Sequence, residues 1–295
     1  MKTDVDEGSM QGKTVVITGG NGGIGRETAV GLASRGARVI ITSRDPDRGA
    51  AALADIRERS GSAAVEVVNL DLASLANVRA CTDELHRRCS HIDVLVNNAG
   101  LILGERAESA DGIEMTLAVN HFGPMALTLR LIDLLAASDA GRIVNVSSDA
   151  HRMARAFDFD DLHSSRRYRS MKAYSQSKLA NILFTRELAP RVDGRGITVN
   201  ALHPGFVRSS FARDGDLGGV FGVVFAAFTR IAAISPEAGA RTSIYLASSS
   251  EVASTTGEYF ARCRSRRPNA AARDSAAARR LWELSEELIG ESLSE

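Results

Sequence analysis

Short apolar runs rich in β-branched residues alternate along this chain with longer segments whose apolar residues recur at helical spacing. Runs of the first kind predict buried strands of a parallel sheet, and segments of the second kind predict helices that cover it. The predicted strands are 14–18, 38–42, 64–69, 93–97, 142–146, 198–202 and 258–261. The predicted helices are 24–34, 45–59, 75–89, 114–136 and 173–192.

The alternation of strands and helices indicates the α/β fold class. We expect a single doubly wound domain, with a parallel sheet of about seven strands and helices on both faces. The 295 residues are enough for one large domain. This domain is expected to span residues 12–290, between a flexible N-terminal segment at 1–11 and a tail at 291–295.

Helix starts are marked at two places by an N-cap residue followed by proline. Asp45-Pro46 and Ser235-Pro236 each place a capping side chain before a proline at the first helical position. Asp45 therefore already has a structural role, which bears on the cofactor site below.

The overall charge balance narrows the classes of partner. Lys plus Arg number 36 and Asp plus Glu number 36, so no excess of positive charge favours nucleic acid or an anionic membrane. Residues 1–11 are polar and acidic, without the apolar core of a signal peptide or a membrane-spanning run. We therefore expect a cytoplasmic protein that acts on a small molecule.

Cysteines and histidines give no metal pattern. The three cysteines lack metal-ligand spacing and fit a reducing cytosol. His121, His151 and His203 are scattered and also lack zinc spacing. No metal site is predicted.

A glycine-rich turn follows the first predicted strand directly and opens the first predicted helix. Glycines at such a turn let the backbone approach a pyrophosphate, and the helix N-terminus supplies free N–H groups and a positive dipole end. The turn lacks the Gly-Lys-Ser/Thr of a phosphate-binding loop, which argues against nucleotide hydrolysis. The predicted dinucleotide-binding residues here are Gly19, Asn21, Gly22, Gly23, Ile24 and Gly25.

The end of the second predicted strand decides between NAD and NADP. An acidic side chain there would bond the ribose 2′-hydroxyl and repel a 2′-phosphate. Ser43 leaves this position uncharged, and Arg44 can pair bidentately with a phosphate, so NADP(H) is favoured over NAD(H). The alternative makes Asp45 the ribose ligand, although its position before Pro46 suggests a helix cap.

The ends of the third and fourth predicted strands complete the cofactor side. Asp71, followed by Leu72, could bond the adenine amino group, and a helix N-cap is an equally good interpretation of Asp71. The small, amide-rich turn at Asn98, Ala99 and Gly100 would let a cofactor lie against backbone.

Tyr174 and Lys178 carry the candidate chemistry. Their i, i+4 spacing on a predicted helix puts both side chains on one face. A phenol has a reference pKa of about 10, and a nearby ammonium favours the phenolate, so the pair could transfer protons to or from an alcohol or carbonyl. Taken alone, this spacing more often reflects a half-buried aromatic ring and a solvated amine.

Three further features are expected near this pair. The strand at 142–146 delivers Ser147 and Ser148 to the carboxyl edge of the sheet, where a hydroxyl can donate to a substrate oxygen. Asn120 could hold a water that links Lys178 to solvent, or it could be a structural amide. Pro204-Gly205 would stiffen a turn beside the nicotinamide.

Together these residues resemble the short-chain dehydrogenase/reductase family over roughly residues 13–290. The resemblance rests on six motifs in order: Thr18-Gly19-x-x-x-Gly23-x-Gly25, Asn97-Asn98-Ala99-Gly100, Asn120, Ser148, Tyr174-x-x-x-Lys178 and Pro204-Gly205. The runs 120–123, 142–151 and 177–185 look like the retinol dehydrogenase and WW-domain oxidoreductase branch. Protochlorophyllide reductases are more distant relatives.

The resemblance implies a Rossmann-type fold and a role for each matched residue. Tyr174 would be the catalytic acid/base, and Lys178 its pKa partner and ribose ligand. Ser148, rather than Ser147, would orient the substrate oxygen, and Asn120 would complete a proton relay. The cofactor would also contact Pro204, Gly205, Val207 and Ser209.

The resemblance also suggests a lid and an oligomer. Residues 206–234 would close over the substrate, and their phenylalanines suggest an apolar pocket or, equally, lid packing or a subunit contact. A membrane-surface contact of the apolar stretch 217–234 is the least favoured alternative. The helices at 114–136 and 173–192 match those that form the dimer bundle in relatives, so a homodimer or homotetramer is expected.

Two basic runs are interpreted as solvated surface, with an anion site as the alternative for the first. One lies in the insert that precedes Tyr174 and the other follows the last predicted strand; their members are Arg152, Arg155, Arg166, Arg167, Arg169, Arg262, Arg264, Arg266 and Arg267.

The sequence therefore predicts an NADP(H)-dependent oxidoreductase that interconverts an alcohol and a carbonyl and takes a lipophilic substrate. The alternatives are a nucleotide-sensing or scaffold protein on the same fold, and an NADPH-dependent C=C reductase.

Overall fold

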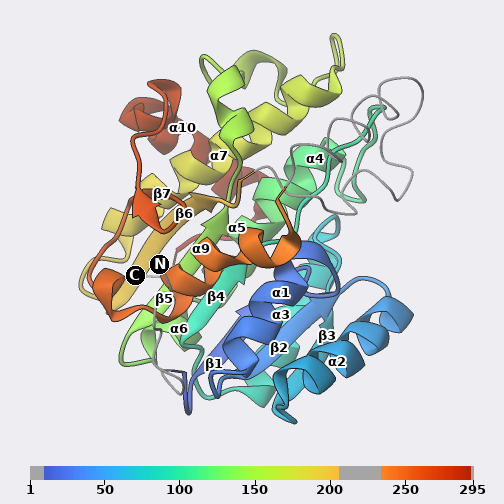
Figure 1. Cartoon of the computed structure of the whole chain (residues 1–295). Coiled ribbons are helices and arrows are strands. Elements are labelled where there is room, and N and C mark those ends of the chain that lie inside the picture. Colours follow the sequence, from blue (N-terminus) through green and yellow to red (C-terminus); the bar gives the residue numbers. More distant parts are fainter. Residues whose placement is uncertain (1–9, 206–233, 294–295) are drawn as a thin grey trace.

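A single sheet of eight strands forms the centre of the computed structural model, which describes residues 10–205 and 234–293 (Figure 1). The strands are β1 (Thr14–Ile17), β2 (Arg38–Ser43), β3 (Val65–Asn69), β4 (Val94–Asn97), β5 (Gly141–Val146), β6 (Ile197–His203), β7 (Tyr259–Ala261) and β8 (Arg264–Ser265). Their order across the sheet is β3-β2-β1-β4-β5-β6-β7-β8. β1 to β7 pair in parallel, and β8 pairs with β7 in the antiparallel sense.

The predicted parallel strands and the α/β fold class are confirmed. Each predicted strand is present within two residues of its expected bounds, while β8 was not predicted. The sheet reverses its order between β1 and β4, because β2 and β3 lie on one side of β1 and the later strands on the other. A ligand site is expected at such a switch point, outside the carboxyl ends of the strands.

Helices cover both faces of this sheet. The α-helices are α1 (Gly23–Ala33), α2 (Pro46–Ser60), α3 (Leu75–Arg88), α4 (Met115–Leu117), α5 (Gly123–Arg130), α6 (Ile132–Ala136), α7 (Ser170–Arg191), α9 (Pro236–Ser248) and α10 (Ser275–Ile289). The remaining turns of helix are η1 (Ala118–Phe122), η2 (Asp149–Met153), η3 (Phe159–Asp161), η5 (Ser250–Val252) and η6 (Ala271–Arg273).

Both predicted N-caps are confirmed. The Asp45 side chain accepts a hydrogen bond from Arg48 N at 3.0 Å, with Pro46 at the first position of α2. Ser235 does the same for Ala238 N at 3.3 Å at the start of α9. These caps satisfy N–H groups that a helix start otherwise leaves unpaired.

The prediction of a single helix at 114–136 is wrong. The segment consists of α4, the π-helical turn η1, α5 and α6, with Leu131 at φ −110° between the last two. An apolar periodicity spans all four pieces, so the pattern alone does not reveal the breaks. π-helical turns inside α-helices frequently mark functional sites, and η1 carries Asn120.

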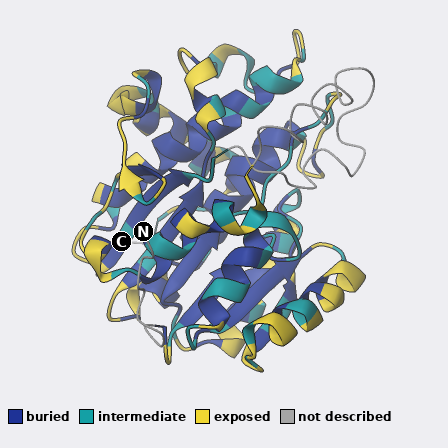
Figure 2. Ribbon diagram, in the orientation of Figure 1, coloured by how far each residue is buried: buried dark blue, intermediate teal, exposed yellow. Residues whose placement is uncertain are grey.

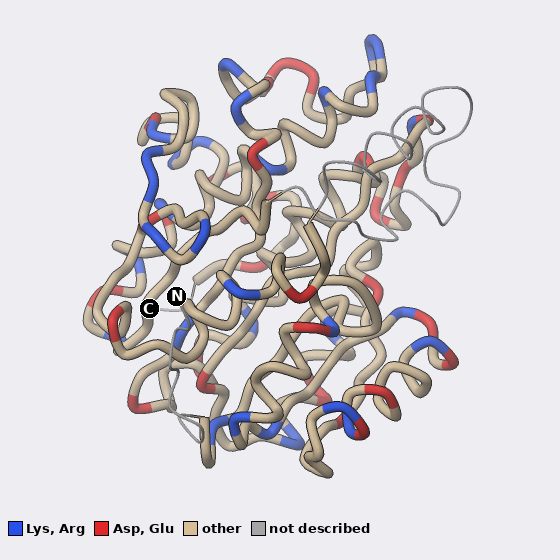
Figure 3. The backbone as a smooth tube through the Cα atoms, in the orientation of Figure 1, with Lys and Arg blue, Asp and Glu red and all other residues tan. Residues whose placement is uncertain are grey.

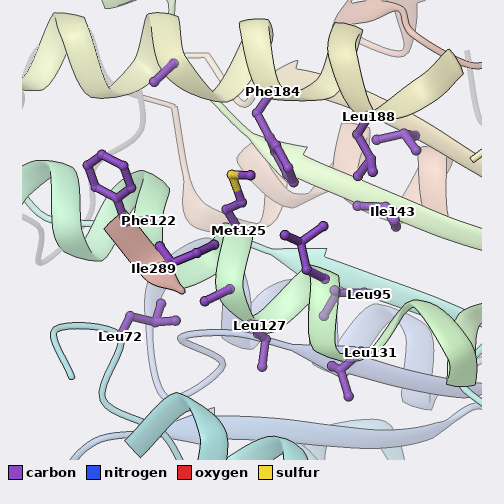
Figure 4. Packing of buried hydrophobic residues seen from close by; sticks show 14 of the residues in the cluster. Leu72, Leu95, Phe122, Met125, Leu127, Leu131, Ile143, Phe184, Leu188 and Ile289 are labelled. Atoms are coloured by element: carbon purple, nitrogen blue, oxygen red, sulfur yellow. The ribbon is translucent and has the colours of Figure 1, made fainter. Parts of the chain in front are cut away.

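The two faces of the sheet bury separate apolar clusters. Residues of α1, α2 and α9 cover one face, and residues of α3, α5, α7 and α10 cover the other. Figure 2 shows the strands as an almost continuously buried layer between them. In Figure 4, Phe184 and Leu188 of α7 reach toward Met125 of α5 and toward Leu95 and Ile143 of the sheet.

The helix α10 packs along α7 and was not among the predicted helices. Trp282 is 2% exposed and stacks on Phe184, with ring centroids 5.9 Å apart. The Arg191 guanidinium lies 4.5 Å from the centroid of the Trp282 ring. Ser285, also in α10, hydrogen bonds through its Oγ to Nε2 of the buried His121 of η1 at 3.1 Å. Part of α7, one of the helices expected to form a subunit contact, is therefore covered by α10 of the same chain.

Several expectations lie outside the described residues. They are the flexible segment at its residues 1–9, the lid at 206–233, Val207, Ser209 and the last two residues of the tail. Among the described helices, none is long and apolar enough to cross a membrane.

Candidate active site

The glycine-rich turn connects β1 to α1 and leaves room at its tip. Gly19 and Gly23 have φ of 65° and 52°, which is the left-handed region that favours glycine. A Cβ at Gly25 would lie 2.4 Å from Gly19 O and from the Asn98 side chain, so this position requires glycine for close packing. A Cβ at Gly22 would meet no atom within 4 Å. Gly22 is also the N-cap of α1 and offers no capping side chain, so the N-cap position does not satisfy the first N–H groups of α1.

Thr18 and Asn98 hold the turn against the end of β4. The buried Thr18 hydroxyl accepts from Asn98 N and Ala99 N, both at 3.0 Å. Asn98 Nδ2 donates to Thr18 O at 2.9 Å. The two loops predicted to hold the cofactor are thus hydrogen bonded to each other in the protein alone.

The end of β2 presents Arg44 to solvent. Ser43 is buried and its hydroxyl donates to Asp45 O at 2.8 Å, while Asp45 caps α2. Within the described ranges 10–205 and 234–293, the exposed Arg44 guanidinium makes no hydrogen bond or ion pair. The Asp45 carboxylate is therefore engaged, and Arg44 is the available charge at this strand tip.

Asp71 lies at the end of β3 but does not cap α3. Its Oδ1 accepts from Ala73 N at 3.0 Å, and Ser74 is the residue that caps α3. The N-cap interpretation of Asp71 is therefore wrong, and contact with adenine stays a prediction. The neighbouring Leu72 is buried, and a Cβ on Gly123 would lie 2.4 Å from Leu72 O.

Asn120 is fully engaged inside the protein. It is 1% exposed, and its Nδ2 donates to Leu101 O and to Ser177 Oγ, both at 2.9 Å. Its Oδ1 accepts from Leu101 N at 2.7 Å. The Asn120 amide thus ties the loop after Gly100 to the helix of Lys178, and its part in a proton relay stays a prediction.

Ser147 and Ser148 have different partners. The Ser147 hydroxyl donates to Lys178 O at 2.7 Å and is buried, so it serves to attach β5 to α7. Ser148 is partly exposed, accepts from Ala150 N at 3.2 Å and hydrogen bonds to Tyr174. Of the two hydroxyls, that of Ser148 is the one placed with the phenol, as expected.

Tyr174 and Lys178 lie on the same side of α7. Lys178 is 3% exposed, and its Nζ donates to Val146 O at 3.1 Å and lies 5.7 Å from the centroid of the Tyr174 ring. A Cβ on Gly100 would lie 3.3 Å from Lys178 Nζ and 3.1 Å from Asn120 Oδ1. Gly100 therefore allows the lysine to reach the edge of the sheet beside the turn that follows β4.

Burial shifts the pKa values of Tyr174 and Lys178 so that the neutral form of each side chain is favoured. Loss of solvent raises the pKa of Tyr174 to about 12, against the smaller opposing effect of its hydrogen bond with Ser148. Burial lowers the pKa of Lys178 to about 8. The expected lowering of the phenol pKa by the ammonium is not seen in the protein alone, because burial dominates and only the hydrogen bond with Ser148 opposes it. The phenol is thus a proton donor at neutral pH.

The turn after β6 closes the described part of the site. Gly205 has φ of 93°, and its N–H donates to His203 Nδ1 at 3.1 Å. This bond fixes the His203 ring beside the predicted nicotinamide position. Among the described residues, no group of His, Cys, Asp and Glu could hold a metal ion.

Sequence reasoning missed several polar residues that shape the site. Asn69 Nδ2 bonds Ser43 O at 3.3 Å and Arg44 O at 3.2 Å, and so supports the strand tip that carries Arg44. Asn97 donates to Asn145, and Asn145 to Thr185 of α7, both at 2.9 Å. A polar residue inside an apolar strand was the available signal for Asn97 and Asn145, but their partners are distant in sequence.

The family model and the most similar curated proteins agree with each other. A family model described as short chain dehydrogenase matches residues 13–216. Human retinol dehydrogenase 14 is 43% identical over 302 residues, which cover 97% of this chain and 88% of that protein. Human retinol dehydrogenase 13 is 42% identical over 288 residues, covering 96% and 86%.

Solved structures share the fold. An uncharacterized protein from Mycobacterium paratuberculosis is 34% identical with a TM-score of 0.78, covering 98% of each chain. The RhlG/NADP active-site complex of Pseudomonas aeruginosa is 28% identical with a TM-score of 0.68, covering 86% of this chain and 96% of that one.

Proposed function

The chain belongs to the short-chain dehydrogenase family, in its retinol dehydrogenase-like branch, and we propose that it is an NADP(H)-dependent oxidoreductase that interconverts an alcohol and a carbonyl. The observation that carries this proposal is the cluster of Ser148, Tyr174 and Lys178. The three side chains come from β5 and α7 and meet at the carboxyl edge of the sheet. A nucleotide-binding scaffold would not need a phenol at this position.

The residues of the cofactor side fit a dinucleotide. The open space at Gly22 and the uncapped start of α1 suit a pyrophosphate. Arg44 would pair with a 2′-phosphate, and the loop at Asn98–Gly100 would lie against the nicotinamide half. The bound nicotinamide supplies or accepts the hydride.

Proton transfer would fall to Tyr174. Because burial holds its pKa at about 12, the phenol is protonated at neutral pH and can donate to a carbonyl oxygen as negative charge develops there. The Ser148 hydroxyl would donate a second hydrogen bond to the same oxygen. Lys178, positioned by Val146 O, would place positive charge near the phenol and favour the phenolate that forms.

Preference for NADP(H) rests on the β2 tip. The acidic residue there, Asp45, is used as a helix cap, and Arg44 is available. The RhlG structure named above is an NADP complex, which supports the same choice. A lipophilic substrate, a homodimer or homotetramer and a cytoplasmic location remain part of the proposal from sequence.

A C=C reductase would use the same donor and the same cofactor, so the test must locate the transferred hydride. We would incubate the full chain with NADPH deuterated at C4 and a panel of aldehydes, ketones, steroids and retinal, and analyse products by mass spectrometry and NMR. Deuterium on a carbinol carbon is expected. Deuterium on a former alkene carbon would replace the proposal with C=C reduction.

The same panel tests the scaffold alternative. Tight NADPH binding without turnover of any compound would favour a nucleotide-sensing protein. Replacement of NADPH by NADH in the assay is expected to lower kcat/KM, and equal values for the two cofactors would remove the proposed preference.

A further inference from the structure

A cavity of about 350 Å³ opens beside the carboxyl ends of β6 and β7, on residues that the proposed reaction does not use. Its lining includes Arg152, His203, Tyr259, Arg262, Arg266 and Arg267. Arg152 lies in η2, the turn after Ser148, and the other arginines belong to the β7–β8 hairpin and the residues after it. In Figure 3 this hairpin appears as a run of blue near the position of β7 in Figure 1.

The lining of this cavity is positively charged, although the chain as a whole is neutral. The whole sequence balances 36 basic against 36 acidic residues, whereas the lining contains four arginines and one carboxylate, Asp149. Asp149 pairs with Arg152 Nε at 2.7 Å. Within the part of the chain that the structure describes, the guanidinium groups of Arg262, Arg266 and Arg267 form no hydrogen bond or ion pair. Three uncompensated positive charges thus border one cavity.

The floor of the cavity contains polar atoms without partners. Tyr259 is 2% exposed, and among the described residues its hydroxyl has no hydrogen-bond partner. Its ring packs against His203 and His151, with centroids 5.9 Å and 5.1 Å apart. His151 Nε2 is equally buried and unpartnered. Buried unsatisfied groups are rare in folded proteins, and an unoccupied ligand or ion site is one reason for them.

His203 adds a donor to this lining. Its Nδ1 accepts from Gly205 N, so the neutral ring carries its hydrogen on Nε2. The cavity therefore combines donors of two kinds, charged guanidinium groups and neutral N–H and O–H groups. Arginine forks match the two oxygens of a carboxylate or phosphate.

The hairpin that carries the arginines is itself unusual. Arg262 and Cys263 have φ of 51° and 57°, so two consecutive residues that are not glycine occupy the left-handed region. Such a two-residue turn strongly prefers Asn-Gly or Asp-Gly, and strained backbone clusters at functional sites. This strain is consistent with a turn kept for the side chains that it presents.

From these observations we infer an oxyanion-binding site between η2 and the β7–β8 hairpin, which binds a phosphate or carboxylate group through Arg262, Arg266 and Arg267 with Tyr259 at its floor. The site is separate from the pyrophosphate turn at β1. His151 connects it to the catalytic edge, because its Nδ1 bonds Ser148 O at 2.7 Å and its ring contacts Tyr259.

Binding of pyrophosphate to the full chain, measured by calorimetry with NADP⁺ already saturating, tests the inference. Saturating NADP⁺ occupies the phosphate sites of the cofactor, so they cannot bind the added pyrophosphate. If the chain does not bind NADP⁺, the Gly22→Asp variant is used instead, because its side chain blocks the turn at β1. Saturable binding of one pyrophosphate is expected. Arg266→Gln should weaken it about tenfold, as expected for the loss of a charge-assisted contact.

Arg264→Gln is the matched control, because Arg264 lies in the same hairpin and is exposed but does not line the cavity. It removes the same charge and should leave the affinity within about twofold, since only distant screened charge is lost. Tyr259→Phe should weaken binding by removing the hydroxyl alone. Absence of saturable binding, or equal losses in Arg264→Gln and Arg266→Gln, would overturn the site.

Activity measurements distinguish two sources of the oxyanion, the substrate's own anionic end and a separate small anion. This arm rests on the proposed function, whereas the calorimetric arm does not. A carbonyl compound ending in a carboxylate is compared with its methyl ester. A KM that rises in Arg266→Gln for the acid and not for the ester identifies the substrate's own anionic end. Unchanged KM values with pyrophosphate binding intact in the wild type identify a separate small anion as the ligand.

Discussion

The glycine-rich turn after β1 and the Tyr174–Lys178 pair lie at the same edge of the sheet but differ in the ionisable groups that they carry. The turn is fixed by hydrogen bonds among its own groups, with the Thr18 hydroxyl serving two N–H groups of the loop after β4. The reactive pair is also held by hydrogen bonds, from Lys178 to Val146 O and between Tyr174 and Ser148, but burial shifts the pKa values of both groups so that their neutral forms are favoured. The turn therefore carries no ionisable side chain, whereas Lys178 of the reactive pair loses its charge as the pH rises through about 8.

This difference determines how substitutions should act. Changes in the turn should alter shape, and hence cofactor affinity or stability, while changes in the pair should alter chemistry with little effect on binding. The predictions below test that separation in order of expected size.

Tyr174→Phe should have the largest effect. Removal of the phenol proton donor is expected to lower kcat by about 10² or more, because the Ser148 hydroxyl alone cannot replace it. NADPH affinity, measured by fluorescence titration, should change little. Full activity in this variant would end the assignment of Tyr174.

Arg44→Ala should weaken NADPH by about tenfold to a hundredfold, as loss of a charged hydrogen bond costs about 1.5–3 kcal/mol. NADH lacks the 2′-phosphate, so its affinity should be nearly unchanged, and its titration is the internal control. Equal losses for both cofactors would assign Arg44 a general structural role instead.

Activity should depend on the charge of Lys178. Its pKa is lowered to about 8, so the ammonium is present below that pH and is lost as the pH rises through it. For carbonyl reduction, kcat/KM should fall above pH 8 and approach about a tenfold loss per pH unit. Lys178→Arg should flatten this limb, because a guanidinium stays charged. A wild-type profile that is level from pH 8 to 9.5 would contradict the prediction.

Gly25→Ala should give the smallest change in activity per folded molecule and a measurable change in stability. Its Cβ would lie 2.4 Å from Gly19 O, and such overpacking costs about 1–3 kcal/mol. For a domain of this size the melting temperature should fall by about 2–4 °C per kcal/mol. Gly22→Ala meets no atom and is the comparison variant. Equal melting temperatures in the two variants would show that the turn adapts.

The strands and the order of site motifs were predictable because they are local in sequence. A buried parallel strand is a short apolar run, and the sequence placed each one within two residues. The breaks between α4 and α6 were not predictable, since every residue from Ala118 to Leu129 is buried and no exposed position marks the π-helical turn. The β7–β8 hairpin was missed because Arg262-Cys263 lacks the usual turn residues.

The sequence identified residues of the candidate site but did not predict the pKa shifts of their side chains. Tyr174, Lys178 and Ser148 were identified from spacing and resemblance. The direction of the Tyr174 pKa shift depends on how many atoms surround the phenol, and burial is a property of the assembled fold. For the same reason the partners of Asn97 and Asn120, which lie on other elements, could not be found from sequence.

The packing of α10 on α7 has a consequence for biosynthesis. A chain is made from its N-terminus, at about 5–20 residues per second, so the helix that carries Tyr174 leaves the ribosome before the helix that carries Trp282. Until Trp282 arrives, the apolar surface around Phe184 lacks its cover. The nascent protein therefore passes through an interval in which this apolar face of α7 is uncovered, and its burial is timed by translation of the residues that follow β8.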